Sequence, residues 1–146
     1  MTTKVPVNWG TSASGELTGV AIHDGRLVGF RSATSTQSYV IENNRSEIVE
    51  IELTGLVDFN VVRFCKGAIT SEVFLWELAA VPQHLWSVSD SAWNTLFEGR
   101  ASPEDAKATA SRLVQARPEA FLFQLLCSYG GSFSAVCDHV SIYRYP

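Results

Sequence analysis

Reactive side chains crowd together only near the C-terminus, where Cys137, Asp138 and His139 are consecutive and Cys127 precedes them. A thiolate nucleophile needs a nearby base, and that base needs an orienting partner. On a β-strand Cys137 and His139 would share one face, roughly 6.5–7 Å apart, while Asp138 would point to the other face. That separation is too long for a direct thiol–imidazole hydrogen bond, so the spacing favours a structural role over nucleophilic catalysis.

A metal site built from Cys127, Cys137 and His139 would have three ligands, whereas a structural zinc site takes four. The other candidate ligands, Cys65, His23 and His84, are scattered along the chain. The glycine pairs of the sequence lack the Lys-Ser/Thr ending of a phosphate-binding loop. We therefore expect no catalytic residue, no metal and no cofactor. We also expect all three cysteines to be reduced and mostly buried.

The C-terminal residues are predicted to form a β-hairpin. Two apolar runs, residues 120–128 and 133–143, flank Gly130-Gly131, which is typical of a tight turn between antiparallel strands. The spacing of the apolar residues in the first run would also suit a helix. We favour the hairpin, which would add two strands to a sheet.

The remaining elements are predicted from periodicity and turn signals. A first hairpin is expected over residues 17–30 around Asp24-Gly25, and strands over 39–41, 49–53 and 56–64. Residues 68–78 fit a strand or a helix, and we favour a strand. Two helices are expected at about 89–117, the second beginning at Ser102-Pro103. The sequence thus predicts one α+β domain over residues 1–146, mainly an antiparallel sheet, with residues 1–15 as a loose lead-in.

Acidic residues concentrate at residues 42–58, where five carboxylates accompany a single arginine. Alternation within this segment predicts that Val49, Ile51 and Leu53 are buried while Glu50 and Glu52 face water. The simplest interpretation is a solvated strand face. The alternative is a docking surface for a basic partner, formed by Glu47, Glu50 and Glu52.

Bulky aromatic residues concentrate in residues 74–97, and most of them must lie in the core of a chain this size. The extended stretch Pro82–Trp86 carries the residues most expected to be exposed, His84 and Trp86. Exposed tryptophan often anchors protein interfaces, so these two residues join the predicted partner-binding set.

Composition excludes several classes of protein. The 146 residues are 46% hydrophobic and 18% charged, which suits one folded domain and argues against disorder. A net charge of −4 argues against nucleic-acid binding and against anionic membranes. No apolar run approaches the length of a membrane span, and the first residues lack a secretion signal. We expect a cytoplasmic protein.

Residues 55–69, Ser128–Gly131 and Cys137 also carry a family resemblance. They resemble small bacterial α+β proteins of uncharacterised families, among them immunity proteins of polymorphic toxin systems. The shared markers are glycines and core aromatics, and no catalytic residue transfers with them. The resemblance implies a small bacterial binding protein that neutralises a toxin by occupying its active site.

Two classes of function follow. The first is a non-enzymatic interaction domain, in its sharpest form an immunity-type inhibitor that meets a basic partner through its acidic surface. The alternative is a small enzyme or ligand-binding protein with a pocket between sheet and helices near Cys137 and His139. The absence of a coherent catalytic set in the sequence favours the first class. A homo-oligomeric role is left open.

Overall fold

The computed structural model describes residues 3–64, 67–81, 92–129 and 131–146. The strands of this part are β1 (Val5–Pro6), β2 (Gly10–Thr11), β3 (Leu17–Thr18), β4 (Arg26–Ser32), β5 (Thr36–Glu42), β6 (Ile48–Val62), β7 (Ala68–Glu77), β8 (Phe121–Cys127) and β9 (Ser132–Tyr145). The helices are a 3₁₀ turn, η1 (Leu78–Ala80), and two α-helices, α1 (Ala92–Phe97) and α2 (Pro103–Ala116).

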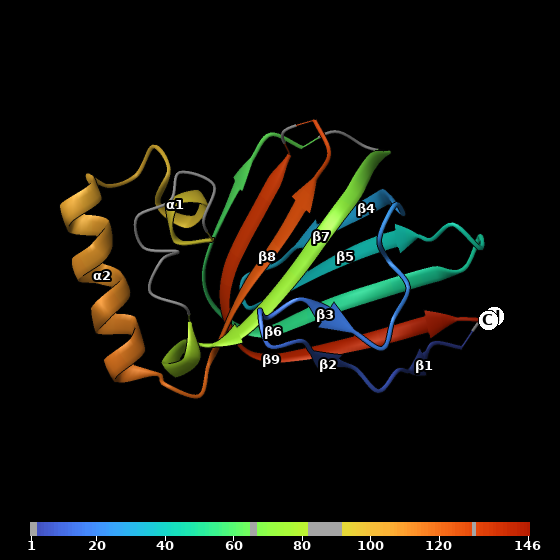
Figure 1. Ribbon diagram of the computed structural model, residues 1–146, viewed down its shortest axis with the longest axis horizontal. Coiled ribbons are helices and arrows are strands. Elements are labelled where there is room, and N and C mark those ends of the chain that lie inside the picture. The colour runs from blue at the N-terminus through green and yellow to red at the C-terminus, as the bar shows by residue number, and fades with distance from the viewer. Residues whose placement is uncertain (1–2, 65–66, 82–91, 130) are drawn as a thin grey trace.

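The main sheet closes into a barrel (Figure 1). Within the described chain, antiparallel pairing runs through β9, β6, β5, β4, β7 and β8, and β8 then pairs back onto β9. The predicted C-terminal hairpin is confirmed, with Phe121 opposite Cys137 and Leu126 opposite Ser132. The strand over residues 68–78 is also confirmed as β7. The α+β class is therefore correct, and the closed barrel is more specific than the sequence predicted.

The barrel interior is filled with apolar side chains, as expected for so few strands. Val49, Ile51 and Leu53 are buried inside, as their alternation predicted. Aromatic rings run through the interior: the Tyr39 ring centroid lies 4.9 Å from that of Phe123 and 5.3 Å from that of Phe133. The buried Tyr39 hydroxyl donates a 2.9 Å hydrogen bond to Gln37 Oε1, so this polar group is satisfied inside the core.

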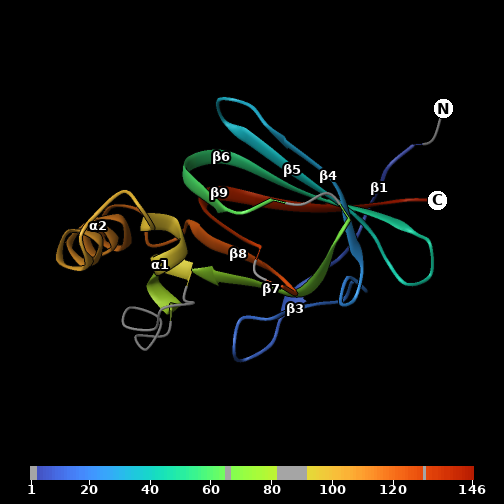
Figure 2. The same cartoon turned by 90° about the horizontal axis from the view of Figure 1, so that it is seen from above.

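The helices lie beside the barrel, with α1 against it and α2 farther out (Figures 1 and 2). Trp93 and Leu96 of α1 form a second apolar cluster with Leu122 and Val136, on the outer side of β8 and β9. The predicted start of α2 is confirmed, because the Ser102 hydroxyl accepts a hydrogen bond from the backbone N–H of Asp105. Neither α-helix that the structure describes has the length and apolar character needed to cross a bilayer.

The predicted first hairpin is wrong. Residues 17–18 pair with β2, and β4 pairs with β5 instead of with residues 17–22. The physical reason is that β7 pairs with β4 only at Arg26–Ile69 and Leu27–Ala68 and then continues past the start of β4. The segment before β4 fills the resulting gap: Leu17 and Ile22 enter the core, and the backbone N–H of Leu75 bonds to the Gly15 carbonyl.

Substitution of Gly15 tests how closely this segment packs against β7. It has φ +88°, and a Cβ at this position would lie 1.9 Å from Nε1 of Trp76. Gly99, with φ +71°, has nothing within 4 Å of its Cβ position. We expect Gly15→Ala and Gly99→Ala each to cost about 1 kcal/mol of left-handed strain, and Gly15→Ala about 1–3 kcal/mol more for moving the indole. Urea unfolding of the two variants measures the difference, and equal losses would contradict this packing.

Candidate functional site

The structure separates the residues that first suggested chemistry. Cys137 lies fully buried inside the barrel, whereas His139 is exposed on its outside. The face that points inward changes between these residues, because Cys137 and Val140 both pack against the same core. This change occurs opposite Gly55, whose φ of +63° kinks β6 beside Asp138. The expectation that Cys137 and His139 share a face is therefore wrong.

The thiols lack the properties of nucleophiles. Burial raises the pKa of Cys137 to about 12, with a further contribution from the negative charge of Asp138. Burial alone raises the pKa of Cys127 to about 11. Asp138 instead forms a 3.0 Å ion pair with Arg117 on the surface. Both described cysteines carry free thiols, while Cys65 lies outside the described residues. Throughout the described ranges no three His, Cys, Asp or Glu side chains are placed to hold a metal ion.

The acidic strand is neutralised by the chain itself. Lys4 Nζ lies 3.8 Å from Glu50 Oε1 and 3.4 Å from Glu52 Oε2, and it sits over the Tyr143 ring. Arg144 lies 3.7 Å from the carboxylate of Glu47. All three glutamates of the predicted docking surface thus have partners, which reduces the charge that they offer to another protein.

Glu50 is buried rather than facing water, contrary to the expectation from alternation. It is only 5% exposed, because Lys4 and Tyr145 cover it, and it accepts hydrogen bonds from the hydroxyls of Ser38 and Tyr145. The bond to Glu50 raises the pKa of Tyr145. Partial burial by itself would lower the pKa of Lys4, but Glu50 and Glu52 raise it overall. The alternation of residues along β6 cannot reveal that Glu50 is covered, because Lys4 and Tyr145 come from distant parts of the chain.

The other two predicted partner-binding residues, His84 and Trp86, lie outside the described residues. The described surface offers a different candidate. One end of the barrel, where β6 and β8 end and β7 and β9 begin, holds a cavity of about 420 Å³. We call it the mouth pocket; its lining residues include Arg63, Ile69, Cys127, Tyr129 and Phe133.

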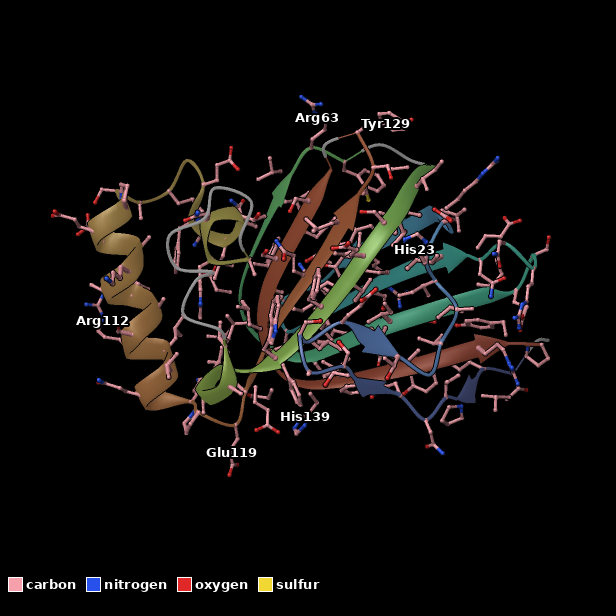
Figure 3. All side chains as sticks on the ribbon, in the orientation of Figure 1. His23, Arg63, Arg112, Glu119, Tyr129 and His139 are labelled. Carbon is pink, nitrogen blue, oxygen red and sulfur yellow. The ribbon has the colours of Figure 1, made fainter. Side chains whose placement is uncertain are left out.

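Exposed apolar side chains line the mouth pocket or lie beside it. Tyr129 is 92% exposed on the β8–β9 turn, Phe64 is 45% exposed and Ile69 is 39% exposed. Phe64 continues the interior aromatic column to the surface, because its ring centroid lies 5.9 Å from that of Phe133. Figure 3 shows Tyr129 and Arg63 projecting from this same end of the molecule. The mouth pocket is therefore an apolar recess with exposed aromatic side chains beside it.

The mouth pocket also has one charged lining residue and two residues with an unusual backbone conformation. Arg63 is the one charged side chain among its described lining residues. Arg63 and Tyr129 both adopt left-handed backbone conformations, with φ of 60° and 69°. Bulky residues seldom adopt this conformation, and such strain is concentrated at functional sites. The arrangement can hold an apolar group and place a cation beside it.

Sequence reasoning missed this site, and one signal for it was available. Tyr129 was part of the predicted turn, where a large aromatic residue is unusual beside two glycines. Compared with protein-family models, with curated proteins and with solved structures, the chain has no significant match in any of the three. The assignment of a site therefore depends on the geometry described above.

The burial of Glu50 gives a stability prediction. Glu50→Ala should lower the free energy of unfolding by about 2 kcal/mol or more, because it leaves Ser38, Tyr145 and Lys4 without their shared acceptor. Glu47→Ala, which removes a more exposed pair with Arg144, should cost no more than about 0.5 kcal/mol. Denaturant unfolding of both variants checks the contrast. Similar losses would mean that Glu50 is more accessible to water than the structure shows.

The raised thiol pKa values give a pH prediction. Above about pH 9 the unfolded chain loses its thiol protons, whereas the native chain keeps the proton of Cys127 up to about pH 11 and that of Cys137 up to about pH 12, so stability falls as the pH rises through this range. Each thiol in this condition contributes a slope of about 1.4 kcal/mol per pH unit. A Cys127→Ala, Cys137→Ala double variant should show a shallower decline. Unfolding free energies at several alkaline pH values measure both slopes, and parallel curves would refute the prediction.

Proposed function

We propose that this protein is a non-enzymatic binding domain that recognises another protein through the mouth pocket. The observation that carries the proposal is the nearly complete exposure of Tyr129 beside an apolar cavity. Exposed aromatic side chains grouped around a recess are typical of interaction sites. Tyrosine and arginine, both present here, are the residue types most enriched at binding hot spots.

Charge indicates the chemistry of the partner. With Arg63 as the only charged group among the described lining residues, the pocket suits an aromatic or aliphatic side chain that has a carboxylate beside it. An arginine fork binds a carboxylate through two hydrogen bonds, so it would orient the inserted side chain as well as attract it. The proposed contact is therefore with an acidic apolar segment, rather than with a basic surface facing Glu47, Glu50 and Glu52.

The preference for a binding domain over an enzyme is based on the separated reactive groups. Cys137 is enclosed with a raised pKa, His139 is on the outside, and Asp138 is paired with Arg117. An immunity-type inhibitor remains the form of binding protein that the sequence resemblance implies. Such an inhibitor would present the mouth pocket to its toxin, and the product of a neighbouring gene is the natural first partner to assay.

A library of random displayed peptides, selected on the immobilised protein, tests the proposal without a known partner. We expect enriched peptides to combine an aromatic or large aliphatic residue with Asp or Glu. Tyr129→Ala and Arg63→Gln should each weaken binding of these peptides about tenfold or more, as expected for hot-spot residues. Neither change should lower the thermal midpoint by more than a few degrees, because both side chains are exposed.

Val57→Ala supplies the matched control, since Val57 is an exposed apolar residue that does not line the mouth pocket. It should leave peptide binding unchanged. The proposal is refuted if no peptide is enriched, or if enriched peptides bind the Tyr129 and Arg63 variants as well as they bind the unaltered protein.

A further inference from the structure

The second half of β6 has a neighbouring strand on only one side. Pairing with β5 ends at Thr54, and the last backbone bond on that side is donated by the Leu56 N–H to the Ser35 carbonyl, at 3.1 Å. Beyond this point β6 continues to Val62, and its pairing within the described chain is with β9 alone. Figure 2 shows the β4–β5 hairpin turning away from this half of β6. Residues 57–62 therefore form a free sheet edge, although the barrel as a whole is closed.

Side chains occupy the hydrogen-bonding groups of this edge. In an antiparallel sheet the backbone groups of alternate residues point to opposite sides of a strand. The Phe59 N–H donates to Oδ1 of Asp58 at 2.9 Å, and the Phe59 carbonyl accepts from Nη1 of Arg100 at 3.3 Å. A neighbouring strand would bond to these same two groups. Asp58 and Arg100 thus take the place of its backbone as partners.

The two side chains are fixed to each other and to helix α1. Arg100 Nη2 lies 3.0 and 3.1 Å from the two carboxylate oxygens of Asp58. Arg100 Nη1 also donates a 3.0 Å bond to the carbonyl of Leu96 in α1. The Asn60 side chain reaches the same helix and donates to the Thr95 carbonyl, also at 3.0 Å. Because of these additional bonds, the Asp58–Arg100 pair is held more firmly than an ordinary surface ion pair.

Without these two side chains the edge would suit pairing with another chain. Val57 and Phe59 are 36% and 39% exposed. Valine and phenylalanine, which favour strands, make up most of residues 57–62. An exposed apolar edge with free backbone groups is a template for a further strand, and natural proteins protect such edges with charged side chains.

We infer that the Asp58–Arg100 pair keeps this edge of β6 from pairing with the same edge of a second copy of the chain. Identical strands can pair antiparallel about a two-fold axis through Asn60. This register places Phe59 of one copy opposite Val61 of the other, so apolar side chains meet at both symmetry-related positions. The inference does not depend on the mouth pocket, so each proposal can fail alone.

The test is sedimentation velocity of the full chain over a range of concentrations. The double variant Asp58→Ala, Arg100→Ala should self-associate at least about tenfold more tightly than the unaltered protein, because the edge loses its cover. Amide hydrogen exchange locates the contact, and exchange at Val61 should slow several-fold when the double variant associates. The single variant Arg100→Gln keeps Asp58 on the Phe59 N–H, so it should show a smaller increase; it replaces the double variant if that one fails to fold.

Two further variants separate loss of the cover from loss of charge. Glu47→Ala with Arg144→Ala removes another exposed ion pair, at a place where Arg144 already has a paired strand on each side. It should leave self-association unchanged. Phe59→Lys, added to the double variant, places a charge on the edge again and should return self-association to that of the unaltered protein.

Three results would each overturn the inference. The first is that neither the double variant nor Arg100→Gln associates more tightly than the unaltered protein. The second is an equal increase in the Glu47, Arg144 variant, which would show that loss of any ion pair is sufficient. The third is association that leaves exchange at Val61 unchanged or that persists with Phe59→Lys, which would place the contact elsewhere.

Discussion

The pairing of β8 with β9 is the constraint on which the rest of the structure depends. A sheet that ended at β7 and β9 would leave two edges with unpaired backbone groups. By pairing with both β7 and β9, strand β8 joins these edges and encloses the aromatic column. The enclosed space is small and must be filled, which explains why rings such as Tyr39, Phe123 and Phe133 occupy it rather than a large central ligand cavity. The proposed binding site accordingly lies at one end of the barrel rather than in its interior.

The barrel is irregular at two places. Strands β4 and β7 share only two residue pairs, and the segment that precedes β4 lies along the rest of β7. The mouth pocket lies where β6 and β8 end, beside the left-handed residues Arg63 and Tyr129. Arg63 is the one charged side chain among the described residues that line the mouth pocket, so the pocket is positively charged.

Local signals in the sequence were sufficient for much of the fold. The Gly-Gly turn placed the last hairpin, alternation placed Val49, Ile51 and Leu53 inside, and Ser102-Pro103 marked the start of α2. Closure of the barrel was not predictable, because pairing between β4 and β7 joins strands that are distant in sequence and involves few residues. The hairpin predicted around Asp24-Gly25 was wrong for the same reason, because the partner of this turn is distant in sequence. Asp24 does adopt a left-handed conformation, but its N–H bonds to Thr70 on β7 instead of closing a hairpin.

The candidate site was less predictable than the fold, because charge in a sequence does not reveal its partners. Glu47, Glu50 and Glu52 formed the most acidic stretch, but Lys4 and Arg144, from opposite ends of the chain, neutralise them. What matters for recognition is the charge left over after a protein has paired its own groups. By that criterion Arg63, rather than the acidic strand, is the charged residue that the proposed binding site offers to a partner.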